Sequence, residues 1–166
     1  MTLLDAPVFN EARYRRNRAI LYGAAGLFVV LFIGGWLGSG MPVDWPWNWW
    51  THFRGRAVAS HFLTAVEQND LQKAYGIWTA DPNWQQHPSQ HAEYPFARFE
   101  QDWSPTSSAN EFGPIHSFKI VAARRSGNVL LMAIRINERK SNALFLDYDP
   151  KTHGLGFSPV ELYLGP

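Results

Sequence analysis

Two histidines four residues apart have the most metal-like spacing in this sequence. His87 and His91 stand at positions i and i+4, the spacing that lets one helix face present two imidazoles to zinc. Pro88 and the polar residues around it favour a loop over 81–93, and no glutamate completes an H-E-x-x-H pattern. We therefore expect no metal site in this segment.

The remaining reactive side chains do not form a recognisable catalytic set. The absence of cysteine excludes disulfides, thiolate metal sites, a catalytic thiol and the lipid-modified cysteine of a lipoprotein. The sequence has no Ser-His-Asp signature, phosphate-binding loop or dinucleotide fingerprint. His52, His61 and His153 lie on a helix or in connections, where surface or hydrogen-bonded histidines are the ordinary interpretation. We expect no cofactor.

Charge is distributed unevenly along the 166 residues. Arg13, Arg15, Arg16 and Arg18 make the N-terminal region basic, whereas residues 39–166 hold eleven lysines or arginines against twelve acidic residues. Nucleic-acid binding needs a basic surface that neutralises phosphates, so we do not expect it of this near-neutral part. Its length is that of one domain.

The longest uncharged stretch runs from Ala19 to Gly38, twenty residues. A helix of this length spans about 30 Å, so we expect one transmembrane helix over 19–38 behind a basic tail over 1–18. The arginines before it place the N-terminus in the cytoplasm of an inner-membrane protein and the C-terminal domain in the periplasm or another extracytoplasmic space. A cleaved signal peptide is the alternative, although Gly38-Ser39-Gly40 imitates its cleavage site poorly.

Small residues on this helix allow a partner helix to approach. Gly34 and Gly38 form one G-x-x-x-G, and Gly23 and Gly26 lie on or near a similar face. Glycine is also simply common in membrane helices, so both interpretations stay open. The first predicts an integral membrane protein as partner.

A Trp/Pro-rich segment, residues 39–53, follows the helix. Its four tryptophans are Trp45, Trp47, Trp49 and Trp50. An indole is apolar with one polar N–H and favours the membrane interface, so we expect an aromatic anchor in the bilayer surface. Pro42 and Pro46 make an extended or turn-like linker the expected conformation.

The domain over 54–166 begins with helical periodicity and continues with strand patterns. Helices are expected over 52–68, 71–78 and 96–103, with Asn69-Asp70 capping the second. Strands are expected over 112–125, 129–136, 143–149 and 155–164, with Pro159 marking an edge or bulge. This order predicts an α+β fold whose sheet is an antiparallel meander.

The domain resembles the nuclear-transport-factor-2-like superfamily, which includes ketosteroid isomerase and the SnoaL-like cyclases. The similarity rests on the segment 62–75, FLTAVEQNDLQKAY, on Tyr94-Pro95-Phe96 with Phe99, and on Phe112-Gly113-Pro114-Ile115 before the first long strand. It covers residues 54–164. A resemblance of this kind implies a fold but not an activity.

The resemblance implies a cone of about three helices on a curved sheet of about four strands, enclosing an apolar pocket. The implied lining is Phe62, Tyr75, Trp78, Phe99, Phe118 and Asp147. Ketosteroid isomerase uses an Asp base with a Tyr and a protonated Asp as oxyanion donors. Tyr75, Asp102, His116 and Asp147 are the counterparts available, but no motif assigns them those roles, and Tyr75 also suits a core position.

Two functions follow. The first is a non-catalytic accessory or assembly subunit of a membrane complex, which contacts the lipid bilayer and binds partners through its helix and outward domain. The second is a pocket-type binding protein or isomerase-like enzyme for an apolar small molecule. The resemblance also allows a homodimer through the sheet, with Lys119, Arg135 and Tyr163 on that surface.

Overall fold

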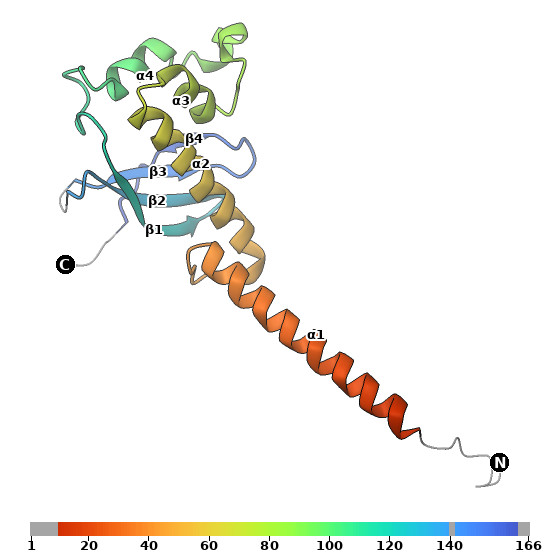
Figure 1. Ribbon diagram of the computed structural model, residues 1–166. Coiled ribbons are helices and arrows are strands. Elements are labelled where there is room, and N and C mark those ends of the chain that lie inside the picture. Colours follow the sequence, from red (N-terminus) through yellow and green to blue (C-terminus); the bar gives the residue numbers. More distant parts are fainter. Residues whose placement is uncertain (1–9, 140–141, 163–166) are drawn as a thin grey trace. The chain divides into compact units, whose positions relative to one another are not determined.

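The computed structural model describes residues 10–139 and 142–162 and divides the chain into two compact units, 1–38 and 39–166. The first unit holds one long apolar helix, α1 (Glu11–Gly38). The second combines further helices with a four-stranded antiparallel sheet (Figure 1). The predicted α+β fold, with helices on a curved sheet, is confirmed.

The helix α1 begins eight residues before the predicted transmembrane segment. The Asn10 side chain accepts a hydrogen bond from the backbone N–H of Arg13 at 3.0 Å, and its carbonyl accepts one from the N–H of Tyr14. These contacts satisfy N–H groups that a helix start leaves unpaired. Residues 11–18 of the predicted tail are therefore helical, Asn10 precedes the helix, and residues 1–9 lie outside the described residues.

The helices of the second unit are η2 (Pro46–Asn48), α2 (Trp49–Glu67), α3 (Leu71–Trp78), η3 (Trp84–Gln86), η4 (Pro88–His91) and α4 (Phe96–Trp103). The α-helices agree with the sequence periodicity except at the start of α2, whereas the predicted loop over 81–93 contains two short 3₁₀ helices. Asp70 caps α3 by accepting from the N–H of Lys73. The start of α2 was expected at His52, so the predicted linker over 39–53 in fact ends in a 3₁₀ turn and a first helical turn.

The four strands form a meander in the order β1-β2-β3-β4, as predicted. Their bounds are β1 (Phe118–Ser126), β2 (Val129–Ile136), β3 (Leu144–Tyr148) and β4 (Leu155–Phe157). The first strand starts later than predicted because Asn137 Oδ1 accepts from the backbone N–H groups of His116 and Ser117. The last strand ends before Pro159, and the part of its prediction over 163–164 lies outside the described residues.

The core lies on one face of the sheet, under α2 (Figure 1). In β3 the buried residues alternate with half-buried ones, so Leu144, Leu146 and Tyr148 face the helices. Helix and sheet approach closely at Gly55, where an added Cβ would lie 2.7 Å from a methyl carbon of Leu130. A larger residue would force the two layers apart.

Candidate functional site

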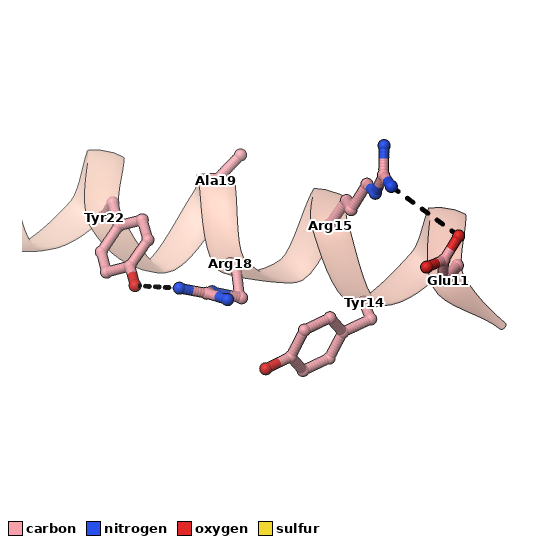
Figure 2. A pocket seen from close by; sticks show the side chains of 6 residues that line it. All are labelled: Glu11, Tyr14, Arg15, Arg18, Ala19 and Tyr22. Atoms are coloured by element: carbon pink, nitrogen blue, oxygen red, sulfur yellow. Dashed lines mark hydrogen bonds and ion pairs between the residues drawn. The ribbon is translucent and has the colours of Figure 1, made fainter. Parts of the chain in front are cut away.

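The first turns of α1 carry a collar of tyrosine and arginine side chains. Arg18 lies between Tyr14 and Tyr22 (Figure 2). Its Cζ is 5.7 Å from the ring centroid of Tyr14 and 5.4 Å from that of Tyr22. Arg18 Nη2 also donates to the Tyr22 hydroxyl at 2.7 Å, and Arg15 lies 3.8 Å from the carboxylate of Glu11. Rings with polar tips beside cations are typical of a membrane–water interface.

The rest of α1 is apolar and exposed. Its mean hydropathy reaches 2.1 over 18 residues, which makes it long and apolar enough to cross a membrane. A Cβ added at Gly23, Gly26, Gly34 or Gly38 would meet no heavy atom within 4 Å among the described residues, apart from the helix backbone and chain neighbours left out of that comparison. These four glycines therefore leave room for another helix.

Three of the four predicted anchor tryptophans are exposed. Trp45, Trp47 and Trp50 keep 67%, 72% and 65% of their surface accessible. Trp49 differs, because it is half-buried and its Nε1 donates to the Asp44 carbonyl at 3.0 Å. Trp49 therefore fixes this segment to the domain. The exposed surface is formed by the other three tryptophans.

The segment before α2 is fixed by a second contact of Asp44. The Asp44 carboxylate lies 2.6 Å from Nε2 of His52, whose side chain is 2% exposed. The sequence suggested a surface or satisfied histidine, and the structure shows a satisfied one. Because one aspartate holds both Trp49 and His52, the segment is built onto the domain rather than hanging as a free linker.

Sequence patterns did not indicate that further side chains join this exposed surface. Val43 is fully exposed, and Phe53 stacks on Trp50 with centroids 5.7 Å apart. Arg125 reaches it from the distant strand β1 and donates to Asn48 Oδ1. Only the apolar residues could be recognised from the local sequence, because a contact between residues 77 positions apart leaves no local pattern.

The residues expected to line a pocket pack against one another instead. Phe62 lies at ring-centroid distances of 5.3 Å from Trp78, 6.1 Å from Phe99 and 4.9 Å from Trp103. Phe62 and Phe99 have no exposed surface, and Phe118 packs half-buried at the margin of the same cluster. These side chains occupy the centre of the domain.

Two tyrosines of this cluster use their hydroxyl groups for structure. Tyr75 donates to the Tyr94 carbonyl at 2.7 Å, and Tyr94 donates to Asp102 Oδ2 at 2.9 Å. Burial raises the pKa of Tyr75, while burial and the neighbouring Asp102 raise the pKa of Tyr94. Arg98 binds the other oxygen of Asp102 at 3.3 Å. Raised pKa values favour the protonated hydroxyls, which donate these two hydrogen bonds.

Asp147 and His116, the other predicted acid–base candidates, lie apart from Tyr75. In β3, Asp147 alternates with the core residues and is half-buried, with Oδ1 against Gly156, and it lines a hollow of about 420 Å³ together with Trp78, His91 and Tyr94. Burial and the negative charge of Asp149 raise the pKa of Asp147. His116 is exposed before β1. The structure does not bring these groups together around one reacting atom.

The paired histidines both contact one carboxylate. Asp81 Oδ2 lies 2.9 Å from His87 Nδ1 and 3.2 Å from His91 Nε2. The hydrogen bond from His87 is the largest cause of a lowered Asp81 pKa. No group of three or more histidine, cysteine or acidic residues suited to a metal occurs in the part of the chain that the structure describes.

The expected dimer surface is basic. Lys119 on β1 and Arg135 on β2 are direct cross-strand partners, so two cations adjoin on the sheet. Tyr163, the third residue named for this surface, lies outside the described residues. Like charges at this pair oppose the stacking of two identical faces there.

No protein-family model, curated protein or solved structure matches this chain. The resemblance to the nuclear-transport-factor-2-like superfamily therefore stays a prediction that rests on the residues quoted above.

Proposed function

We propose that this protein is a membrane-anchored, non-catalytic accessory or assembly subunit of a membrane protein complex. The observation that carries the proposal is the packed centre of the domain. Phe62 packs against Trp78 and Phe99 at the centre of the domain, and the Tyr75 hydroxyl donates to a main-chain carbonyl. A domain of this kind is suited to present a surface and not to enclose a small molecule.

The helix α1 supports the membrane part of the proposal. It is apolar over a membrane-spanning length, and the arginine-rich collar at its start favours a cytoplasmic N-terminus and an extracytoplasmic domain. The inner membrane and the periplasm are the compartments this orientation gives in a Gram-negative cell.

The open glycine positions support a helical partner within the bilayer. Gly34 and Gly38 lie on one face and have free space at their Cβ positions. Close backbone approach at such pairs is the way membrane helices associate, because lipid supplies no hydrophobic drive between them. An integral membrane protein is thus the proposed partner.

The test is copurification of the full chain from its native membrane in a mild detergent. We expect a stoichiometric membrane protein with the wild type and its loss in the Gly34→Leu/Gly38→Leu variant. Ala25→Leu is the matched control, because nine residues at 100° each place Ala25 about 180° round the helix from Gly34. A monomer without stoichiometric partner in every mild detergent contradicts the proposal.

The pocket-type alternative makes a different prediction. It requires that Phe62 and Phe99 separate to admit a ligand, whereas neither ring has any exposed surface. The burial of these two rings weighs against this alternative, and the accessory function is the one proposed.

A further inference from the structure

The second unit exposes a group of large apolar side chains at the start of the domain. We name it the aromatic patch; it consists of Val43, Trp45, Trp47, Trp50 and Phe53. Each of these side chains is at least half exposed. Trp45 stacks on Trp47 at 5.0 Å, and Trp50 stacks on Phe53 at 5.7 Å, so the rings form two flat pairs. Grouped apolar side chains of this size mark an interaction surface.

Two arginines border the aromatic patch. The Arg54 guanidinium lies 5.8 Å over the Trp50 ring, and Arg125 donates to the side chain of Asn48, between the two ring pairs along the chain. Neither arginine is within 4.0 Å of a carboxylate in the described residues. Their charges are therefore available for an anionic group outside the chain.

The position of the patch in the chain limits what it can reach. Val43 follows the end of α1 at Gly38 by five residues, and a chain of that length covers at most about 18 Å. The helix before it is long and apolar enough to cross a membrane. If α1 spans the bilayer, the patch is confined near the lipid headgroups whatever else the domain does.

We propose that the aromatic patch is a second membrane contact, in which its five apolar side chains enter the headgroup–acyl boundary while Arg54 and Arg125 bind phosphates of anionic phospholipids. Indole and phenyl rings favour that boundary, and guanidinium groups pair with phosphate through parallel N–H bonds. The inference requires α1 to span the membrane and goes beyond the accessory function.

The contacts of Asp44 couple the aromatic patch to the rest of the domain. Asp44 holds Trp49 and His52, so the patch is continuous with α2 and not carried on a flexible tether. Docking of the patch then fixes the orientation of the whole domain on the bilayer. A partner complex would meet one defined face of the domain.

The absence of cysteine allows a direct test with spin labels on the full chain in lipid nanodiscs. Labels are attached to Val43→Cys and Phe53→Cys, with Gln72→Cys and Lys151→Cys as exposed controls elsewhere on the domain. We expect the two patch labels to collide with oxygen more than with an aqueous nickel chelate, at a depth of about 5–10 Å. The two controls should show the reverse preference.

The arginines are tested in the same discs with Arg54→Gln/Arg125→Gln, and Arg139→Gln serves as a charge-matched control. At about fivefold for each arginine near an anionic surface, the double variant should lower the docked-to-undocked ratio by about 30-fold in phosphatidylglycerol discs. In phosphatidylcholine discs the effect should be much smaller. Arg139→Gln should match the wild type in both lipids.

Three results overturn the proposal. The first is that the patch labels are as accessible to water as the Lys151 label. The second is dipolar coupling between patch labels that appears only in discs holding two copies of the chain. Such coupling would make the patch an interface between copies. The third is an equal effect of the double variant in both lipids, which would exclude anionic headgroup binding. None of them depends on whether a partner copurifies with α1.

Discussion

Two groups of aromatic side chains in the second unit face different surroundings. The interior group contains Phe62, Trp78, Phe99 and Trp103, none of which exposes more than 6% of its surface. The aromatic patch holds the same residue types, yet its tryptophans keep about two thirds of their surface accessible. Residue type alone therefore does not decide which rings enter the core.

The local backbone accounts for the difference. The interior rings lie on α2, α3 and α4, where helical spacing gathers them on the faces that meet. Trp45 and Trp47 instead flank Pro46 at the start of η2, where they stack on each other at an interplanar angle of 4°. The Asp44 contacts pull Trp49 and His52 inward and leave the neighbouring rings outside.

The largest expected effect comes from removing an interior ring. Phe62→Ala should lower the free energy of unfolding by about 3–5 kcal/mol, because the ring is fully buried and three other aromatic rings would face the cavity. Urea unfolding of the full chain in detergent, followed by tryptophan fluorescence, measures this change. Phe62→Leu should retain part of the stability. An unchanged midpoint in Phe62→Ala would show that the interior group is not the core.

The second-largest expected effect tests whether the contact between Asp44 and His52 keeps the aromatic patch exposed. His52→Ala should cost about 1–3 kcal/mol, since it leaves the Asp44 carboxylate without its partner and opens space beneath the segment. It should also speed hydrogen exchange of the amides over 41–48. His61→Ala, an exposed histidine on the same helix, is the control and should change neither quantity. Equal exchange in the two variants would mean that Asp44 and His52 do not brace the patch.

How far the sequence predicts this architecture depends on whether the determinant is local. The bounds of α3, α4 and β2 agree with prediction because a capping aspartate, a proline and a turn mark them directly in the chain. The start of α2 does not, since Pro42 and Pro46 masked a helix that begins just after them. The late start of β1 depends on Asn137, about twenty residues away.

The candidate site depends on tertiary contacts even more than the bounds of the helices and strands do. Composition alone indicated exposed tryptophans, and three of the four are exposed. It did not indicate that Trp49 turns inward or that Arg125 borders the patch, because both depend on tertiary contacts. The alternation of β3 placed Asp147 opposite to its neighbours, but which of the two faces the helices cover is not readable from the strand itself.

Tyr94 lies at the margin of the interior group, and its substitution should have a smaller effect on the free energy of unfolding that depends on pH. Tyr94→Phe should cost about 0.5–1.5 kcal/mol at neutral pH through the lost hydrogen bond to Asp102. Burial and Asp102 raise the folded-state pKa of Tyr94, so above about pH 10 the unfolded chain loses this proton first and wild-type stability falls as pH rises. The deficit of the variant should therefore shrink between pH 9 and pH 11. Urea midpoints of both proteins across that range measure it, and a constant deficit would contradict the pKa direction.

The smallest expected effect on stability belongs to the patch itself. Phe53→Ala makes the same chemical change as Phe62→Ala, but half of the Phe53 surface is already exposed, so we expect a change within about 0.5 kcal/mol. The pair of variants therefore separates a ring that stabilises the fold from one available to an external surface. Measured side by side in detergent, a loss for Phe53→Ala as large as that for Phe62→Ala would place both rings in one core. A negligible loss would show that folding does not need this ring, which leaves the ring available to contact an external surface.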